Sequence, residues 1–586
     1  MKIKKILTVF GLLLYGSTLL AQQRNSDMAM LIAREFFASK GASQEPQLAI
    51  MESPRIESKR SKRREETTNT ISRDDSYYIV NDYANNRFVI VSKDEQMLTI
   101  LGYSESGTFD EQTAPPGLLD MLAEYNLQYD AMERTGERII EQSPQTSTVP
   151  IPYMIKTTWD QKEPFWNDCP HDSNGKNCVT GCVATAMAQI MNYHKWPLNG
   201  SGGIVSYESR PYITEIAQSF NFDELIIDWN NMVDSYNQTT TQSQNSEVAK
   251  LMHACGVSVY MDYDSSESGA DPADIAYALI NNFGYNPNIY YAEKEYYTSE
   301  EWNEIILSEL KINRPILYGG GDHQFILDGA EEDGRYHLNF GWNGSCDGWY
   351  VLDAIVTRNG DFSSGQSMVV GICPQEAGIK RDVFYADDFM LEGGAAVGNK
   401  TKITSLPVWC FSSEANTMKG KAQFQGEYGI GAFDKKHNFV KSLYRSSTSC
   451  YARTKQSKSG SSVAVSFDEA IFTEGSEYLL RPYAKSSNSS QPTIMRNKPE
   501  KEIWYKATVK AGKVLLEKGG EFTTDEKKLG DSNGDGVIDV ADIVNIVNYI
   551  MMKPMSNFIF ENSDMDYDGI IDVADITIVV NKIMNP

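Results

Sequence analysis

One cysteine, Cys182, stands where the sequence predicts the start of a helix. It follows Thr180 and Gly181, which form a cap and turn pattern. The later side chains that share one helical face are Val183, Met187, Ile190, Met191 and His194. A thiol at a helix N-terminus lies at the positive end of the helix dipole, beside backbone N–H groups that can receive negative charge. The pattern indicates a nucleophile, with a buried structural cysteine as the alternative.

A cysteine nucleophile needs an imidazole within hydrogen-bond reach, oriented by a third polar group. Of the six histidines, His194 lies about 18 Å further along the same helix and is excluded as the partner. Three others lie in a polar loop, an apolar helical segment and a separate domain: His171, His253 and His437. Two candidates for the base therefore remain, His323 and His337.

His323 is favoured because it follows a glycine turn and opens a predicted strand, a position that presents a side chain to a cleft. His337 lies in the middle of a strand. Asn339 is the expected orienter, holding the imidazole through its amide oxygen. An oxyanion on the substrate needs two donors, for which we expect the backbone N–H of Cys182 and the side-chain amide of Gln161.

A second chemistry recurs near the C-terminus, where two loops carry Asp or Asn at positions 1, 3, 5, 9 and 12 and Gly at position 6. This spacing wraps oxygen ligands around Ca²⁺ and predicts two bound ions. The first loop offers Asp531, Asn533, Asp535, the Val537 carbonyl, Asp539 and Asp542. The second offers Asp564, Asp566, Asp568, the Ile570 carbonyl, Asp572 and Asp575. Asp at position 12 departs from the EF-hand, which has Glu there.

The chain of 586 residues is too long for one core, so several domains are expected. A net charge of −25 argues against nucleic acid as a partner. Lysines before an apolar run predict a signal peptide over 1–21, and hence an exported protein that is not integral to a membrane. Eight cysteines do not suggest a disulfide scaffold if Cys182 is free, and the one pairing considered is Cys410 with Cys450.

The segment 22–148 reads as a small α+β domain, with helices over 28–39 and 118–134 and strands over 77–80, 87–91 and 97–101. Its basic run, 59–64, is a solvated loop or a processing site, and the proline-broken stretch 143–152 reads as a linker. Helices before strands predict an α+β domain over 149–375. Short alternating runs predict a β-sandwich over 376–522, and the paired loops form an all-α module over 523–586.

The motifs of 149–375 resemble the streptopain family of secreted bacterial cysteine peptidases. They are Trp-Asp-Gln at 159–161, Pro-Phe at 164–165, the helix 181–194, Met-Asp-Tyr at 261–263, Asn-Phe-Gly-Tyr at 282–285, His-Gln-Phe-Ile-Leu-Asp-Gly at 323–329 and Asn-Phe-Gly-Trp at 339–342. Segments 88–91 and 100–109 look like that family's inhibitory propeptide. Two departures stand beside the site: Phe340 replaces a Trp, and Asp322 and Gln324 flank the histidine where the family commonly has Gly and Ala.

The resemblance implies a papain-like fold in which Cys182 is the nucleophile, His323 the general base and acid, and Gln161 the oxyanion donor. Asn339 would lie in the segment that supports the histidine. It further implies endopeptidase action through an acyl-enzyme, self-removal of the propeptide, and a preference for a bulky apolar residue two positions from the scissile bond.

The C-terminal loops resemble dockerins, which dock onto cohesins, although Val-Ala stands at 540–541 and 573–574 where a Ser/Thr pair is frequent. The hypothesis is a secreted cysteine endopeptidase zymogen that cleaves protein or peptide substrates, with a β-sandwich and Ca²⁺-dependent docking. One alternative is another papain-like thiol hydrolase, such as a cell-wall peptide amidase. The other is a catalytically inert adhesive or binding protein.

Overall fold

The structure, a computed structural model, describes most of the chain. The described residues are 23–52, 76–95, 97–135, 149–209, 216–320, 323–354, 365–374, 383–411, 423–451, 456–457, 463–487, 489, 491–499, 504–519, 529–534, 537–551, 553, 558–565 and 571–584. The predicted signal peptide, the basic run 59–64 and residues 143–148 of the predicted linker lie outside these ranges. So do the side chains of Cys410 and Cys450, and the other six cysteines form no disulfide with one another.

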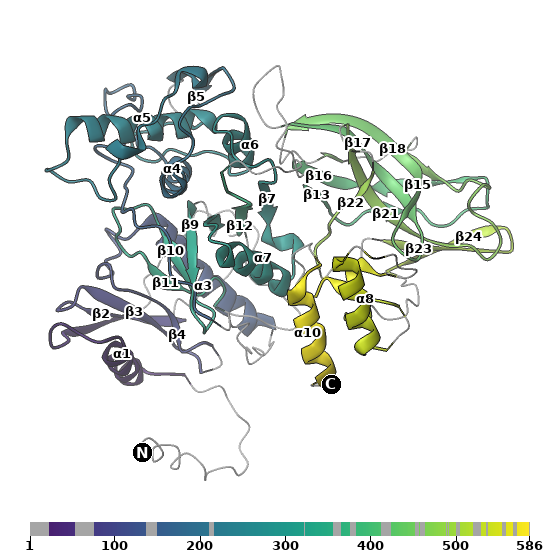
Figure 1. Ribbon diagram of the computed structural model, residues 1–586, viewed down its shortest axis with the longest axis horizontal. Coiled ribbons are helices and arrows are strands. Elements are labelled where there is room, and N and C mark those ends of the chain that lie inside the picture. Colours follow the sequence, from purple (N-terminus) through teal and green to yellow (C-terminus); the bar gives the residue numbers. More distant parts are fainter. Residues whose placement is uncertain are drawn as a thin grey trace, which may run out of the picture.

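A ten-stranded sheet runs through the described N-terminal half of the chain, in the order β1-β2-β3-β4-β11-β10-β9-β8-β12-β7 (Figure 1). Its strands pair antiparallel throughout. The first four are β1 Leu48–Glu52, β2 Tyr77–Asp82, β3 Arg87–Ser92 and β4 Ile100–Ser104. The others are β7 Tyr290–Glu293, β8 Ile316–Gly320, β9 His323–Ala330, β10 Tyr336–Asn339, β11 Gly348–Tyr350 and β12 Ser367–Val370.

Two helices sandwich the N-terminal strands. On one face α1, Ser26–Lys40, buries Ala29, Ala33 and Phe37 against alternate residues of β2 and β3, and on the other face lies α3, Pro116–Thr135. Because successive strand residues point to opposite faces, burial on both faces makes β2 and β3 apolar almost throughout. The predicted elements are all present, with β4 displaced by three residues from the predicted 97–101.

Four α-helices follow: α4 Cys182–His194, α5 Gln242–Ser258, α6 Asp274–Asn281 and α7 Ser299–Lys311. Capping boxes begin α5 at Thr241 and α7 at Thr298. A hairpin of β5, Ile204–Ser209, and β6, Ile216–Asn221, packs against α5. Short 3₁₀ turns occupy Phe222–Glu224, Trp229–Asn231 and Lys294–Tyr296. In this region the helices come before most of the strands along the chain, which is the α+β order that the sequence predicted.

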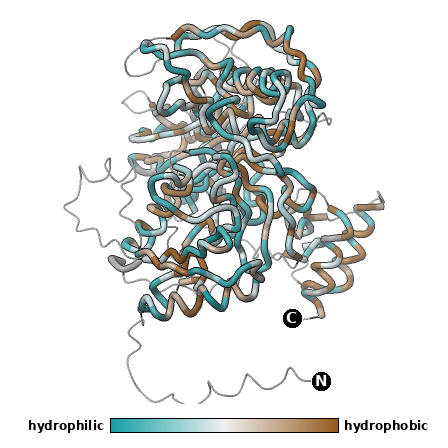
Figure 2. Tube along the Cα trace, turned by 90° about the vertical axis from the view of Figure 1, so that its left-hand side faces the viewer, coloured by the Kyte–Doolittle hydropathy of each residue, from teal (hydrophilic) through white to brown (hydrophobic). Residues whose placement is uncertain are grey.

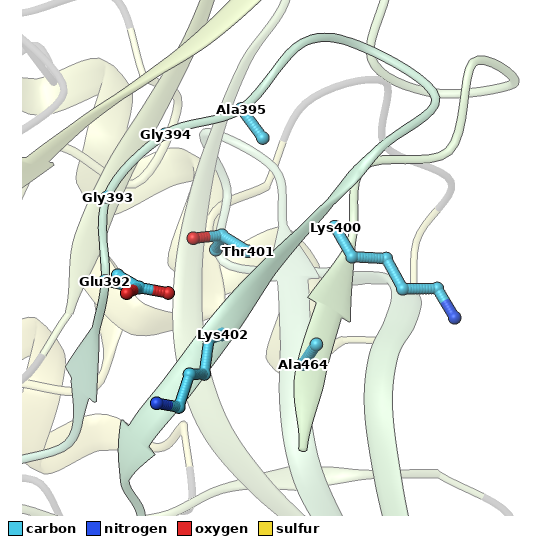
Figure 3. A pocket seen from close by; sticks show the side chains of 8 residues that line it. All are labelled: Glu392, Gly393, Gly394, Ala395, Lys400, Thr401, Lys402 and Ala464. Carbon is cyan, nitrogen blue, oxygen red and sulfur yellow. The ribbon is translucent and has the colours of Figure 1, made fainter. Parts of the chain in front are cut away.

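The described residues between 383 and 519 form an all-β region. Its strands are β13 Val383–Ala386, β14 Met390–Leu391, β15 Lys400–Ser405, β16 Pro407–Phe411, β17 Gln423–Phe433, β18 Phe439–Tyr451, β19 Gln456–Ser457, β20 Ala464–Ser466, β21 Glu477–Ser486, β22 Thr493–Ile494, β23 Tyr505–Lys510 and β24 Lys513–Lys518. They form three sheets around one apolar core. A cavity of about 660 Å³ beside β15 is lined by Glu392, Lys400, Thr401 and Lys402, among others, and by none of the predicted catalytic residues (Figure 3).

The C-terminal repeat forms helices α8, Val540–Ile550, and α10, Val573–Met584, with the short α9, Phe560–Ser563, between them. Ile546, Ile571 and Val579 make a small core between the two longer helices. In Figure 2 this helical pair stands out to one side of the body. Each long helix follows its predicted calcium loop, as the repeat in the sequence implies.

Candidate active site

Cys182 is the first residue of α4, as predicted, but the cap differs from the prediction. The N-cap is Gly181 at φ +84°, and it makes no side-chain cap hydrogen bond. A Cβ at Gly181 would lie 2.8 Å from the Met261 side chain and 2.9 Å from the Ser268 carbonyl, so only glycine is accommodated. The Thr180 hydroxyl instead shares a hydrogen bond with that of Thr185, inside the first turn.

The expectation that α4 has one apolar face was too narrow. Every residue from Val183 to Asn192 is buried, because the helix lies between the central sheet and α5. A helix buried all round is held rigidly. Cys182 therefore occupies a fixed position at the end of a central element.

The side chains of Cys182 and His323 are hydrogen-bonded to each other, and the backbone N–H of Gln324 donates to the Cys182 sulfur at 3.4 Å. Burial acts to raise the pKa of Cys182, but His323 and the N–H groups of Gln324 and Val183 outweigh it and hold the pKa below its usual value. Burial acts to lower the pKa of His323, but Cys182, with Asp120 and Glu267, raises it. Both shifts favour a thiolate and an imidazolium.

The other candidate histidine, His337, is buried and paired with Asp328, with 2.6 Å between Nδ1 and Oδ1. Its ring stacks on Tyr153. Burial lowers the pKa of both His194 and His253 to about 4. The surroundings of His194, His253 and His337 therefore do not place them as partners of Cys182. His323 is the histidine that the structure brings to Cys182.

The expected hydrogen bond from Asn339 to the imidazole is absent. The Asn339 amide oxygen accepts from Gln189 Nε2 and from the Gly341 N–H, both at 3.0 Å, and its amide nitrogen donates to the Thr157 carbonyl at 2.9 Å. A buried amide whose oxygen and nitrogen are both engaged has no oxygen left for His323. Since Gln189 belongs to α4, Asn339 fastens the Cys182 helix to β10.

Gln161 lies in the segment beside the start of α4. Its carbonyl accepts from the Thr180 N–H at 3.2 Å, two residues before Cys182, and the residue is buried. This backbone contact brings the predicted oxyanion donor into the neighbourhood of the nucleophile.

Helix α3 covers His323, a contact that sequence reasoning missed. Asp120 Oδ2 lies 3.9 Å from His323 Nε2, and a Cβ at Gly117 would lie 3.5 Å from the His323 Cβ and 3.3 Å from the Phe340 ring. Phe340 also packs edgewise on Tyr350. The N-terminal region thus supplies a carboxylate and a helix surface to the site. Asp322, the other predicted departure, lies outside the described residues.

The two predicted calcium loops repeat one geometry. Asp542 accepts from the N–H groups of Asn533 and Asp539, one with each carboxylate oxygen. Asp575 accepts in the same way from Met565 and Asp572. Four predicted ligands lie outside the described residues: Asp535, Asp566, Asp568 and Ile570.

Family models match three successive parts of the chain. The peptidase C10 family matches residues 159–350, the Spi protease inhibitor 21–129 and the dockerin type I domain 529–584. The site and these domains define a cysteine protease made as a zymogen, with an inhibitory propeptide and a calcium-binding dockerin module.

The chain belongs to the peptidase C10 family. Streptopain of Streptococcus pyogenes is 31% identical over 320 residues, which cover 49% of this chain and 78% of that protein. The thiol protease/hemagglutinin PrtT of Porphyromonas gingivalis is 30% identical over 322 residues, which cover 51% of this chain and 37% of that protein. The solved prointerpain A fragment of Prevotella intermedia is 30% identical with a TM-score of 0.46, covering 53% of this chain and 98% of that fragment.

Proposed function

We propose that Cys182 is the nucleophile of this protease and His323 its general base and acid. The Cys182 thiolate attacks a peptide carbonyl, and the backbone N–H of Cys182 and the Gln161 amide receive the oxyanion. His323 then protonates the leaving amine, which leaves an acyl-enzyme that water hydrolyses with His323 as base. The observation that carries this assignment is the hydrogen bond between Cys182 and His323 at the N-terminus of a rigid helix.

Asn339 is proposed as a positioning residue rather than as the orienter of the imidazole. It links β10 to Gln189, which also accepts from the Thr157 hydroxyl at 2.7 Å. Through this network the segment that carries Gln161, the helix that carries Cys182 and the end of β10 hold one arrangement.

The test is Cys182→Ala in the full chain, with the buried Cys255→Ala as matched control. We expect the Cys182 variant to remain a full-length precursor, to cleave no casein and to lose labelling by a thiol alkylator. The control should process and label normally. Normal maturation and casein cleavage by Cys182→Ala would overturn the assignment.

The zymogen is proposed to divide into a signal peptide over 1–21, an inhibitory propeptide over 22–148, the peptidase domain over 149–375, a β-sandwich over 376–522 and the dockerin module over 523–586. Three sheets around one core support the sandwich. Secretion is supported by the charged and apolar N-terminal pattern. Among the described residues no helix has the length and apolar character needed to cross a membrane.

The dockerin module is proposed to bind two Ca²⁺ ions through the twelve ligands predicted from its loops, and to dock onto a cohesin-like protein. The repeated buried geometry of Asp542 and Asp575 supports two equivalent sites. An exposed apolar stripe along α8 and its C-cap residue supports a protein partner: Val540, Val544, Val547 and Met551.

A further inference from the structure

Glu331, at the turn between β9 and β10, joins the peptidase to the propeptide far from the nucleophile. Its Oε1 atom accepts from the Tyr103 hydroxyl at 2.6 Å and from Lys40 Nζ at 3.0 Å. Tyr103 belongs to β4 and Lys40 ends α1, so both donors leave with the propeptide in the proposed division of the chain. Strand β9 has eight residues, so about 27 Å of extended chain separates Glu331 from His323 at its other end. This contact therefore holds the propeptide without touching the reacting groups.

The peptidase itself holds the Glu331 carboxylate in place. The second oxygen, Oε2, accepts from Arg335 Nε at 2.9 Å, and Arg335 is also paired with Asp333 of the same turn. Arg335 is buried, and its carbonyl accepts from the backbone N–H of Glu331 at 2.8 Å, which closes the turn. The peptidase thus fixes one carboxylate oxygen, and the other oxygen accepts from the propeptide donors.

Aromatic side chains of the propeptide enclose the contact. Tyr103 is buried, and Phe36 of α1 packs edgewise on it with 4.9 Å between ring centroids. Lys40 Nζ also donates to the Tyr103 hydroxyl, and the Arg335 guanidinium lies 5.3 Å from the Tyr103 centroid. Glu105, which follows β4, adds a second negative charge that acts on Tyr103. Charge-assisted hydrogen bonds shielded in this way are stronger than an exposed ion pair, so the cluster contributes to propeptide binding.

The strength of this contact depends on the charge of Glu331. Burial acts to raise the pKa of Glu331, but the Tyr103 hydroxyl, Arg335 and Lys40 outweigh it and hold the pKa below its usual value. Burial and the hydrogen bond to Glu331 raise the pKa of Tyr103, so its hydroxyl remains a donor. Tyr103 and Lys40 leave with the propeptide, so Glu331 is easier to protonate in the free protease. By linkage, the contribution of Glu331 to propeptide binding is full above the free pKa and is lost as pH falls through the lower, bound pKa.

We propose that Glu331, Lys40 and Tyr103 form an acid-sensitive latch: the peptidase carboxylate binds the N-terminal part of the propeptide, and its protonation weakens that hold and speeds maturation. The proposal rests on the division between propeptide and peptidase proposed above. It adds a second point of control to helix α3, which covers His323 at the opposite end of β9.

The test compares Glu331→Gln with Glu332→Gln, an exposed glutamate of the same turn, in a full-length precursor that carries Cys182→Ala. Hydrogen exchange of α1, Ser26–Lys40, reports the opening of the latch. At pH 7 we expect exchange in Glu331→Gln to be about tenfold faster than in the precursor with Glu331 intact. At pH 3.5 this ratio should be smaller, because protonation then weakens the unchanged latch as well. Glu332→Gln should leave exchange unchanged at both pH values.

Lys40→Met and Tyr103→Phe test the latch from the propeptide side, where the mature protease keeps its own sequence. Each removes one donor to Glu331 with little change in side-chain volume. In the active zymogen each should speed maturation several-fold at pH 7, while kcat/KM of the released protease stays the same. Combined with Glu331→Gln, Lys40→Met should add less than its separate effect, because both changes remove one interaction.

Three results would overturn the latch: equal exchange of α1 in Glu331→Gln and Glu332→Gln, a ratio that does not fall between pH 7 and pH 3.5, or fully additive effects of Lys40→Met and Glu331→Gln. N-terminal sequencing of the mature protease tests the division on which the latch rests. A mature chain that keeps residues 26–104 would overturn both the division and the latch, whereas one that loses them with unchanged exchange overturns the latch alone. Maturation of the Cys182→Ala precursor would count against the proposed nucleophile instead.

Discussion

The hydrogen bond between Cys182 and His323 determines how the two side chains titrate. The pKa of Cys182 lies below its ordinary value and the pKa of His323 lies above its ordinary value, and both shifts favour the thiolate–imidazolium pair. On raising the pH, activity should therefore appear below the ordinary thiol pKa and decline only above the ordinary histidine pKa. Because each pKa unit is tenfold in thiolate, alkylation at pH 6 should be slower in His323→Ala matured in trans by the wild-type protease than in the wild type, by about tenfold for each unit that its Cys182 pKa rises. Equal rates in both proteins would contradict the pairing.

A second titrating group is the buried Asp347, whose carboxylate accepts a hydrogen bond from the backbone N–H of Phe340. Burial raises its pKa to about 7, against the opposing effects of the Phe340 N–H and His337. A folded pKa above the unfolded value means that the charged form is disfavoured in the fold, so stability is lost as pH rises from about 4 through about 7. Asp347→Asn keeps the acceptor for Phe340 but stays neutral.

This variant should match the wild type at pH 4 and be more stable at pH 8, by up to roughly 4 kcal/mol. Thermal melts at the two pH values measure the difference. The exposed Glu224→Gln on the turn Phe222–Glu224 is the control and should show no such dependence. A loss of stability at pH 8 in Asp347→Asn would mean that the charged form is the one the fold favours.

At the residue scale, local chemistry predicted Cys182 and His323, because a thiol at a helix start and an imidazole at a strand start have sequence signatures. The contact of Asp120 with His323 had none, since the two residues lie in different segments brought together by folding. The prediction that Asn339 orients the imidazole was wrong for a related reason. Its partner Gln189 is distant in the sequence and lies in the middle of a helix.

At the scale of elements, the junction between β4 and β11 joins the propeptide to the peptidase. Gly102 pairs with Tyr350 there, and a Cβ on Gly102 would lie 2.3 Å from the Tyr350 ring and 3.0 Å from the Trp349 carbonyl. Gly102→Val should therefore force the strands apart without altering the mature enzyme, because residue 102 leaves with the propeptide.

We expect the Gly102→Val zymogen to mature at least several-fold faster and its isolated propeptide to inhibit mature enzyme more weakly. A time course of processing and inhibition titrations measure both effects. Gln44→Val, on an exposed N-terminal segment, is the control and should behave as the wild type. Unchanged processing and inhibition in Gly102→Val would show that the strand junction does not hold the propeptide.

Periodicity predicted most elements near the site but not their partners. The helices 28–39 and 118–134 and the strands at 77, 87 and 323 follow from local patterns. The continuous sheet did not, because β4 and β11 are far apart in the sequence and pairing leaves no local mark. The burial of α4 on all sides depends likewise on α5 packing over it, which the apolar face of α4 alone does not reveal.

At the scale of the whole molecule, the all-β region is anchored to the peptidase rather than merely following it. Arg496 contacts both carboxylate oxygens of Glu301 at 2.8 Å and lies 4.0 Å from the Tyr297 ring centroid. Tyr385 is fully buried and stacks on Tyr296 with 4.1 Å between centroids. Glu301 and the two peptidase tyrosines belong to the start of α7 and the turn before it.

Tyr385→Ala should therefore destabilise the peptidase itself by about 3–5 kcal/mol, the usual cost of removing a large buried aromatic side chain. Differential scanning calorimetry should show the peptidase transition lowered in temperature. Arg445→Ala, in an exposed ion pair of the β region, is the control. An unmoved peptidase transition in Tyr385→Ala would mean that the two regions fold independently.

Calcium removal should act on the C-terminal module and spare the catalytic site. Asp542 and Asp575 are fully buried carboxylates within an acidic repeat, and without a cation backbone N–H groups are left to offset their charges. Chelation should expose residues 529–584 to trypsin while cleavage of a small peptide substrate continues unchanged.

Isothermal titration should count two ions in the full chain, one in Asp542→Ala or Asp575→Ala, and two in the exposed control Glu517→Ala. A fall in peptidase activity in step with calcium loss would instead mean that the module stabilises the catalytic region.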